Sequence, residues 1–355
     1  MNKVYYYHLV SISECHRLWE KGEYPGHLLY GLTHLYKHGL DAIYDDIPFN
    51  PFKSRIRLMI YMLKTLVFSR KKYDAIYAVT FRGLELVIFL RALRLFKKPI
   101  AVWHHTAIVI PDNKIKRILS AFFYRGIDKM FFFSDELMNR SLLTRKVKRE
   151  NTKVVHWGPD LEYYAAFNEQ ARDKIRFVST GAEHRDFITL LNAFNDPKIS
   201  AFCQFYIKKS QENFIRMSFD GCKLSSNIHL NFGNWSQNEC THFVDEADVV
   251  VICCLNYPYT IGLTTLVEAW ALGKAVIVTD NPTFPIDVEK EGIGIKVPYG
   301  DIKSWVKAID YLETNPEVVV KMGKKAKSLA QNFYNLNKLT EDVAETLLLL
   351  TKDCN

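Results

Sequence analysis

The sequence predicts an α/β protein built from two consecutive doubly wound domains, and three observations support this fold class. The chain has 355 residues, which is more than one ordinary domain needs. It is 48% hydrophobic and 24% charged, a globular composition with enough apolar residues for two cores. Short β-rich runs alternate with helical segments along both halves, as in the βαβ units of parallel sheets.

The first half contains six apolar runs of strand length, separated by segments with helical patterning. The expected strands cover residues 4–10, 41–44, 73–79, 99–103, 129–133 and 153–156. The expected helices cover residues 27–38, 55–68, 84–96, 114–124 and 135–145. A Pro-Gly turn at Pro25-Gly26 precedes the first of these helices, and Gly39 follows it as a helix terminator.

The same alternation resumes in the second half after a break at Gly158-Pro159-Asp160 and a polar, aromatic stretch to Arg172. The expected strands cover residues 174–179, 202–207, 227–231, 248–254, 275–279 and 293–297. The expected helices cover residues 186–194, 237–244, 263–272, 302–312, 318–333 and 338–350. We therefore expect an N-terminal domain over 1–165, a C-terminal domain over 166–335, and a last helix within 336–355 that packs back on the N-terminal domain.

Charge is distributed unevenly between the halves. Residues 1–150 hold 26 basic and 13 acidic side chains, a net +13, whereas residues 151–355 hold 21 and 26, a net −5. Residues 51–100 alone carry 12 basic and 2 acidic side chains. Such asymmetry favours an anionic partner for the first half, either nucleic acid or a membrane surface. Because no nucleic-acid-binding motif accompanies the charge, we expect a membrane and no nucleic acid.

The cysteines and the N-terminus indicate a cytoplasmic protein. Seven cysteines occur, none with CxxC spacing, and Cys253-Cys254 follows an apolar run, so buried free thiols are expected. Free thiols fit a reducing compartment. The first residues lack the apolar core of a signal peptide, and no uncharged apolar stretch reaches the roughly 20 residues of a spanning helix. The chain is expected to be soluble or to lie on a membrane without crossing it.

The most informative motif covers residues 248–282. An apolar strand leads into a loop, and then Gly262, Thr264 and Thr265 start a helix that carries Glu268 one turn later. Backbone N–H groups, the helix dipole and two hydroxyls at such a position can hold a diphosphate. A carboxylate there can accept hydrogen bonds from a ribose diol. The alternative is an ordinary strand–helix–strand unit with a surface glutamate.

This segment resembles the donor-site signature of retaining glycosyltransferases of the GT-B type, particularly family 4. That signature reads Gly-Leu-x-x-Leu-Glu-Ala-Met-Ala-x-Gly-Lys-Pro-Val-Ile. Residues 262–277 read Gly-Leu-Thr-Thr-Leu-Val-Glu-Ala-Trp-Ala-Leu-Gly-Lys-Ala-Val-Ile, with one extra residue before the glutamate. The resemblance implies two Rossmann-like domains facing each other across a cleft, a nucleoside-diphosphate sugar as donor substrate, and Glu268 on the nucleotide ribose.

The sequence departs from that signature at its first glutamate. The family usually has two glutamates separated by seven residues, and the position eight before Glu268 is Thr260, preceded by Tyr259. In the family, the first glutamate contacts the transferred sugar. The departure therefore concerns the donor sugar more than the nucleotide, and Thr260 is an alternate sugar-site residue.

A second motif, residues 177–191, combines a strand, a loop containing Gly181 and a helix for which Asp186 is a candidate cap. By resemblance, this loop supplies a basic pair that grips the diphosphate. Arg185 fills the second position of the pair, and the first is Ala182. A guanidinium bound to a phosphate stabilises the charge of a leaving group. The alternative is an Arg185 that pairs with Asp186 or Glu183 on the surface.

Two further motifs belong to the first half. The segment around Gly26 resembles the glycine loop in the first domain of the family, and that loop faces the donor. His104 and His105 end an apolar strand, and their side chains point to opposite faces, so only one can enter a site. By resemblance His105 positions the transferred sugar, with His104 as the alternate. Zinc binding is disfavoured because adjacent histidines do not readily share one tetrahedral ion and no Cys/Asp/Glu cluster lies nearby in the sequence.

The basic segment over residues 54–72 is apolar on most helical faces and cationic at its ends, which suits an interfacial helix on anionic lipid. The alternative is a core helix with solvated ends. The expected membrane or acceptor face consists of Arg55, Arg57, Lys64, Arg70, Lys71 and Lys72.

Together these motifs, in the family's order, predict a metal-independent retaining glycosyltransferase without a cofactor. Its expected catalytic residues are His105, Arg185 and Glu268, and its donor site adds Gly26, Gly181, Gly262, Thr264 and Thr265. The expected acceptor is a glycan or lipid-linked hydroxyl at the inner face of the plasma membrane, as in bacterial surface polysaccharide or glycolipid assembly. The alternatives are a sugar-nucleotide epimerase or hydrolase on the same fold, or an inactive scaffold. Hydride transfer is disfavoured because neither first strand is followed by Gly-x-Gly-x-x-Gly.

Overall fold

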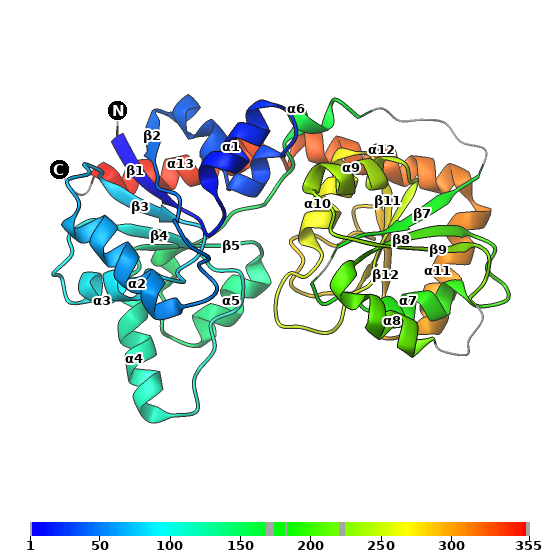
Figure 1. The fold of residues 1–355 in the computed structure, drawn as a ribbon, viewed down its shortest axis with the longest axis horizontal. Helices are drawn as coiled ribbons and strands as arrows, with labels where there is room; N and C mark the ends of the chain where they lie inside the picture. Colours follow the sequence, from blue (N-terminus) through cyan, green and yellow to red (C-terminus); the bar gives the residue numbers. More distant parts are fainter. Residues whose placement is uncertain (1, 168–173, 182, 220–223, 353–355) are drawn as a thin grey trace. The chain divides into compact units, whose positions relative to one another are not determined.

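The computed structural model describes residues 2–167, 174–181, 183–219 and 224–352. The chain divides into two compact units (Figure 1). The first contains Met1–Trp157 together with Leu336–Asn355, and the second contains Gly158–Asn335. The break thus falls at the start of the Gly-Pro-Asp segment, eight residues before the expected boundary at 165/166.

The first unit is built on a six-stranded parallel sheet with the order β2-β1-β3-β4-β5-β6. Its strands are β1 Asn2–Tyr7, β2 Leu40–Ile43, β3 Ala75–Ala78, β4 Ile100–Trp103, β5 Lys129–Phe132 and β6 Thr152–Val154. The central strands β3 and β4 are completely buried, as their continuous apolar sequences require in a sheet covered on both faces.

Helices and short turns connect these strands. They are α1 Ile12–Glu20, η1 Gly26–Leu29, η2 Leu32–His38, α2 Arg55–Leu63, η3 Lys64–Phe68, α3 Glu85–Ala92, α4 Lys114–Tyr124, α5 Asp135–Leu143 and η4 Arg149–Asn151. Polar side chains define several helix starts, because Ser54, Asn113 and Ser134 each accept hydrogen bonds from backbone N–H groups of the first turn. The expected bounds of α4 are confirmed.

The helix expected over 27–38 is wrong. Two short 3₁₀ segments, η1 and η2, replace it. Tyr30 and Gly31 lie between them in the left-handed region, with φ values of 52° and 89°. A continuous α-helix cannot pass through that conformation. The segment also buries His27, Thr33 and His34, so it packs as an irregular layer instead of an amphipathic helix.

The last helix, α13 Leu336–Lys352, belongs to the first unit, where it contacts η2, β1 and β3. Its buried face consists mainly of aliphatic side chains at helical spacing, which include Leu339, Val343 and Leu347. Lys153 of β6 also forms an ion pair with Asp342 of this helix at 3.0 Å. The second unit is therefore an insertion between Trp157 and this helix in chain order.

The second unit contains a second six-stranded parallel sheet, with the order β12-β11-β10-β7-β8-β9. Its strands are β7 Arg176–Ser179, β8 Phe202–Lys208, β9 Ile228–Gly233, β10 Val249–Ile252, β11 Ala275–Thr279 and β12 Gly294–Val297. These two sheets confirm the predicted fold class of two Rossmann-like α/β domains.

Helices cover both faces of the second sheet (Figure 1). One group comprises α7 Phe187–Phe194, α8 Glu212–Ser218 and α11 Ile302–Thr314, in which α7 contacts the other two. The other comprises α9 Gln237–Asp245, α10 Leu263–Ala271 and α12 Pro316–Asn332, in which α10 contacts the other two. The short elements are α6 Leu161–Tyr164 and η5 Lys209–Gln211.

The strand order of the second sheet defines where a ligand is expected to bind. From β7 the chain proceeds outward through β8 and β9, then returns to the other side of β7 and proceeds through β10, β11 and β12. The topological switch point therefore lies between β7 and β10. Ligands of such sheets bind beyond the carboxyl ends of the strands at this point.

Candidate functional site

The loops that follow β7 and β10 are joined directly at the switch point. Arg185 and Cys254 form an isolated antiparallel bridge between them. The amide of Leu255 donates to the carbonyl of His184 at 2.9 Å, and the amide of Asp186 donates to the carbonyl of Cys253 at 3.0 Å. This pairing brings the two sequence motifs, which are about 80 residues apart, into one site.

The Arg185 guanidinium connects three segments of the second unit. Its Nε donates to the carbonyl of Thr180 at 3.0 Å, Nη1 to Cys254 Sγ at 3.2 Å and Nη2 to Thr265 Oγ1 at 2.9 Å. A guanidinium has five N–H groups, so two terminal N–H groups remain beyond these contacts. The side chain is held in a fixed orientation and keeps donors for an anion.

The alternative in which Arg185 pairs with its acidic neighbours is wrong. Asp186 instead caps α7, where its carboxylate accepts from the amide and the hydroxyl of Thr189. Glu183 accepts from the Tyr259 hydroxyl at 3.1 Å. Ala182, expected at the first position of the basic pair, lies outside the described residues.

Glycine is required on two sides of this guanidinium. Gly181 has φ +102°, and a Cβ there would lie 2.4 Å from Arg185 Nη2. Gly262 has φ +92°, and its Cβ would lie 2.6 Å from the Ile252 side chain and 3.3 Å from Arg185 Nη1. Both positions combine a backbone conformation that favours glycine with a lack of space. Gly181, Arg185, Gly262 and Thr265 are thus brought together.

The start of α10 adds the other predicted hydroxyls. Gly262 precedes the helix, and Thr264 is half-buried in its first turn. Thr260, the residue eight positions before Glu268, is buried, and its Oγ1 has no hydrogen-bond partner among the described residues. A buried hydroxyl without a partner is uncommon in folded proteins.

Glu268 is only 2% exposed and lies against α9. Its Oε1 accepts from Thr241 Oγ1 at 2.6 Å and from Gln237 Nε2 at 3.3 Å. Burial raises the pKa of Glu268 to about 7, although the hydrogen bonds from Thr241, Gln237 and Tyr164 favour the ionised form. The surface glutamate of the alternative reading is therefore wrong.

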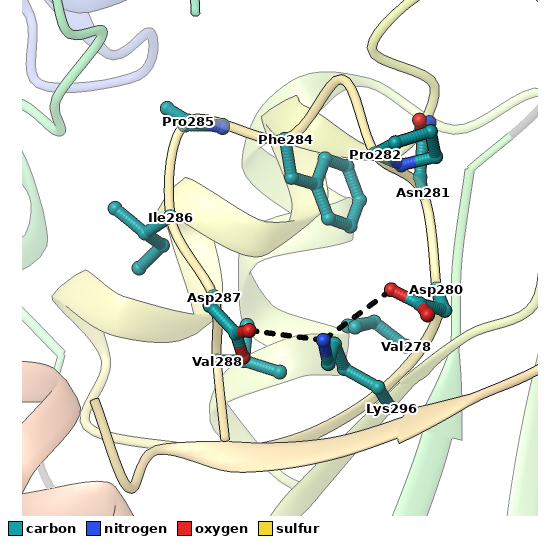
Figure 2. Close-up of a pocket in the computed structure, with 10 residues that line it drawn as sticks. All are labelled: Val278, Asp280, Asn281, Pro282, Phe284, Pro285, Ile286, Asp287, Val288 and Lys296. Atoms are coloured by element: carbon teal, nitrogen blue, oxygen red, sulfur yellow. Dashed lines mark hydrogen bonds and ion pairs between the residues drawn. The ribbon is translucent and has the colours of Figure 1, made fainter. Parts of the chain in front are cut away.

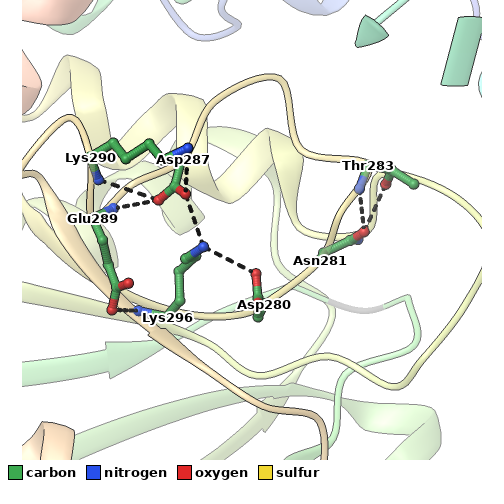
Figure 3. Close-up of polar contacts among 7 residues, drawn as sticks. All are labelled: Asp280, Asn281, Thr283, Asp287, Glu289, Lys290 and Lys296. Carbon is green, nitrogen blue, oxygen red and sulfur yellow. Dashed lines mark hydrogen bonds and ion pairs between the residues drawn. The ribbon is translucent and has the colours of Figure 1, made fainter. Parts of the chain in front are cut away.

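The β11–β12 loop supports the site from one side. Thr279 Oγ1, at the end of β11, accepts from the Cys254 amide at 2.8 Å. Asn281 Nδ2 donates to the carbonyl of Tyr259 at 3.1 Å, and Asn281 Oδ1 accepts from the amide and hydroxyl of Thr283 (Figure 3). Side chains at the end of β11 and in the loop after it therefore hold the backbone at Cys254 and Tyr259.

A small hollow of about 220 Å³ lies farther along the same loop (Figure 2). Lys296 forms ion pairs there with Asp287 at 3.0 Å and Asp280 at 3.5 Å. A larger hollow of about 900 Å³ lies at the amino ends of β7 and β8, at the opposite edge of the sheet. Neither hollow is lined by Arg185 or Glu268, and the topology favours the loops at the carboxyl edge.

In the first unit, the two histidines after β4 occupy different environments. His104 is buried, with Nδ1 2.6 Å from the Thr106 carbonyl and Nε2 3.0 Å from the Tyr124 hydroxyl. His105 Nε2 lies 3.0 Å from the Tyr30 hydroxyl. Burial lowers the pKa of each histidine to about 4, so both are neutral near pH 7.

Gly26 is buried and starts η1, the segment that leads to Tyr30. It does not have a left-handed backbone. The positions expected at a membrane or acceptor face are exposed, yet three of them have partners within the unit: Arg55 with Glu85, Lys71 with Asp45, and Arg57 over the Phe49 ring. Lys64, Arg70 and Lys72 are also exposed.

Other expectations concern thiols, metals and membranes. Cys15, Cys203, Cys240, Cys253 and Cys254 are free thiols, whereas Cys222 and Cys354 lie outside the described residues. Within the described ranges, no three His, Cys, Asp or Glu side chains are grouped so as to hold a metal ion. No helix in the part of the chain that the structure describes is both long and apolar enough to span a bilayer.

Sequence reasoning missed the residues that surround Glu268. Gln237 and Thr241 lie one helical turn apart on α9, and the structure places both on the carboxylate. Their spacing of four residues puts them on one helix face. Nothing in the sequence connects that face to a glutamate 27 residues later, because the contact depends on how α9 and α10 pack.

One family model matches part of the chain. Residues 161–329 match the family model described as Glycosyl transferases group 1. These residues include both site loops, α9 and α10. A sequence search found no match among curated proteins.

Many solved structures resemble this chain, and three of them illustrate the likeness. HepE from Anabaena in complex with UDP-glucose has 12% identity and a TM-score of 0.70, covering 98% of this chain and 99% of that one. Sucrose-phosphate synthase from Thermosynechococcus elongatus has 12% identity and a TM-score of 0.74, covering 99% and 100%. A trehalose-6-phosphate structure from E. coli bound with UDP-2-fluoro glucose has 10% identity and a TM-score of 0.72, covering 99% of each chain.

At these identities the likeness concerns the fold. The chain thus has the two Rossmann-like domains of GT-B glycosyltransferases, and nearly all of its second unit matches the family of group 1 glycosyl transferases.

Proposed function

We propose that the protein transfers a sugar from a nucleoside-diphosphate sugar to an acceptor hydroxyl, with retention and without a metal ion. The observation that carries this proposal is the Arg185 guanidinium, which is fixed at the switch point between Gly181 and Gly262 with N–H groups left for an anion. The match of the second unit to group 1 glycosyl transferases supports the same reading.

The chemistry proposed for the diphosphate follows from the local donors. Cleavage of the sugar–phosphate bond leaves negative charge on the departing nucleoside diphosphate. Arg185 neutralises that charge, while the first turn of α10 offers backbone N–H groups and the hydroxyls of Thr264 and Thr265. A guanidinium and a helix start thereby supply the leaving-group stabilisation that a divalent cation supplies in other enzymes.

Glu268 is proposed to bind the nucleotide ribose. A carboxylate accepts two hydrogen bonds from a vicinal diol, and Thr241 and Gln237 already hold one of its oxygens in place. Because the pKa of Glu268 is about 7, the carboxylate becomes a full acceptor only above neutral pH. Donor affinity is then expected to increase as the pH rises through 7.

The donor sugar is proposed to approach Thr260, whose buried hydroxyl lacks a partner among the described residues. A hydroxyl at this position replaces the family's glutamate, so contacts to the sugar hydroxyls are uncharged here. On the first unit, we assign His105 to substrate positioning, with Gly26 in the segment beside it. His105 contacts the Tyr30 hydroxyl, and its neutral imidazole is not a general acid near pH 7.

The acceptor is proposed to be a glycan or lipid-linked hydroxyl bound to the basic first unit. We place this reaction at the inner face of the plasma membrane, in the assembly of bacterial surface polysaccharide or glycolipid. The net +13 of residues 1–150 supports an anionic surface as the neighbour of this unit.

The replacement of glutamate by Thr260 favours one second candidate, a scaffold that binds nucleotide without transfer. The test is incubation of the protein with UDP- and GDP-sugars, with and without lipid-linked acceptors, followed by NMR of the anomeric proton. Transfer with retained configuration supports the proposal. Inverted products, or sugar release and epimerisation independent of acceptor, contradict it. Nucleotide binding without any turnover across the panel indicates the scaffold.

A further inference from the structure

Helix α4 of the first unit exposes an apolar stripe where a surface helix is normally polar. Ile115, Ile118, Leu119 and Phe122 follow one helix face at spacings of three and four residues. The first three are 69%, 70% and 50% exposed. Phe123 is the only buried residue of the eleven in this fully described helix, which projects from the body of its unit (Figure 1).

The apolar stripe leads to a basic hollow. Phe122, its last member, lines a cavity of about 870 Å³ between α3 and α4 and stacks on Phe89 at a centroid distance of 6.1 Å. The cationic side chains that line the hollow are Arg91, Arg94, Lys97, Lys98 and Arg125. Asp128, the acidic residue in this lining, is engaged by Arg91 at 2.7 Å. Four cations therefore surround the hollow in addition to that ion pair.

Charge along this segment is almost entirely positive. Residues 91–125 hold eight basic side chains and one acidic side chain, Asp112, a net +7 within a chain of net +8. Lys114, Lys116 and Arg117 flank the apolar stripe on α4. Leu93 and Leu95 add exposed apolar side chains near the hollow, and Val109 and Ile110 add them before α4.

An apolar helix face with flanking cations and an adjoining cationic hollow matches an anionic bilayer. Aliphatic side chains enter the acyl boundary, and lysine and arginine contact the lipid headgroups. A second copy of the chain fits poorly, because a symmetric contact would bring the two +7 segments together. With eleven residues α4 is too short to span a bilayer.

We infer that α4 and the α3–α4 hollow form an interfacial membrane-docking surface for anionic lipid. α4 lies in the plane of the interface with Ile115, Ile118 and Leu119 inserted, and the hollow holds phosphate headgroups. This inference rests on the proposed function for its purpose, since it presents the first unit to a lipid-linked acceptor. The inferred docking contact is therefore α4. The Arg55–Lys72 segment, which the sequence predicts at a membrane, is less suitable because several of its cations have partners within the unit.

The test is co-sedimentation of the full chain with vesicles of phosphatidylcholine and phosphatidylglycerol, against vesicles of phosphatidylcholine alone. The wild type binds the anionic vesicles, and the combined I115S, I118S and L119S variant loses at least tenfold in partition coefficient. Replacing Arg94, Lys97 and Lys98 by alanine lowers the coefficient by roughly fivefold per cation at low salt, with a smaller loss at high salt. An Ile118→Trp reporter shifts its fluorescence to the blue on binding.

Matched controls distinguish binding through this surface from nonspecific adsorption to vesicles. F214S with M217S alters an equally exposed apolar pair on α8 of the second unit and leaves vesicle binding unchanged. Binding of UDP, measured by calorimetry, is the same for all variants, so a failure of donor chemistry is distinguished from a failure of docking.

Three results overturn the inference. The first is wild-type protein that does not bind anionic vesicles. The second is an α4 variant that still binds anionic vesicles as the wild type does, together with an R55A/R57A variant that has lost this binding. The third is an α4 variant whose only change is the loss of self-association in sedimentation, which would identify a second copy as the partner.

Discussion

Replacing Glu268 with glutamine should stabilise the second unit at high pH while weakening donor binding. A carboxyl whose pKa rises from 4.5 in the unfolded chain to about 7 in the fold is disfavoured there once it is ionised. The difference corresponds to about 3 kcal/mol of folding free energy when both states are ionised. Glutamine keeps the shape and an acceptor for Thr241 without the buried charge.

The direction of the pH dependence follows from the raised pKa. The folded state holds the proton more tightly than the unfolded state, so the stabilising effect is complete below pH 4.5 and is lost as the pH rises through about 7. Wild type and E268Q should therefore have similar stability at pH 4.5. E268Q should be more stable by up to about 3 kcal/mol at pH 8.

The assay is urea unfolding monitored by tryptophan fluorescence at several pH values, with UDP titrations on the same samples. Glu239→Gln is a control of opposite sign, because the Glu239 carboxylate accepts from the Ser236 amide, which lowers its pKa. That variant should lose stability at neutral pH, and the loss should vanish as the pH falls. A pH-independent difference between wild type and E268Q would contradict the buried charge of Glu268, and unchanged UDP affinity in E268Q at pH 8 would contradict its contact with the ribose.

Three further predictions concern the site and the fold. Gly181→Ala should abolish nucleotide binding, because its Cβ would lie 2.4 Å from the site guanidinium; calorimetry should show intact binding for Gly300→Ala, which has positive φ but open space. Thr241→Val should raise the pKa of Glu268 further, so UDP affinity should fall at pH 7 and recover at pH 9. A chain ending at Asn335 should leave the first unit unfolded in proteolysis and circular dichroism, since four large aliphatic side chains of α13 contribute roughly 6–12 kcal/mol.

The sequence predicted the two sheets well because their strands are short, continuous apolar runs. β11 has the predicted bounds, and its five residues are all buried. The amphipathic helix α1 over Ile12–Glu20 was missed, as was α8 over Glu212–Ser218. Both are short, with nine and seven residues, and short helices are stabilised mainly by tertiary packing, which local patterning does not reveal.

Some features of the candidate site could likewise be predicted from the sequence, and others could not. Gly181, Arg185, Gly262 and Thr265 could be predicted because they lie in loops that resemble the family's donor loops and follow strands whose carboxyl ends bind ligands in parallel sheets. The exact contacts of Arg185 could not be predicted, because its hydrogen bond to Cys254 Sγ depends on the bridge between the two loops. Burial of a charged residue likewise depends on packing between helices, as the environment of Glu268 shows.

Calorimetric titration of UDP and GDP into wild type, Arg185→Ala and Arg216→Ala tests whether Arg185 binds the diphosphate of the donor. Arg216 is an exposed arginine on α8 that pairs with Glu212, so it matches the charge change away from the switch point. At least one nucleotide should bind wild type and Arg216→Ala with equal affinity. Arg185→Ala should lose at least roughly tenfold in affinity, as expected for a charge-assisted hydrogen bond, with its melting temperature showing an intact fold. Equal affinity of all three proteins, or no binding of either nucleotide to the wild type, would contradict this role of Arg185.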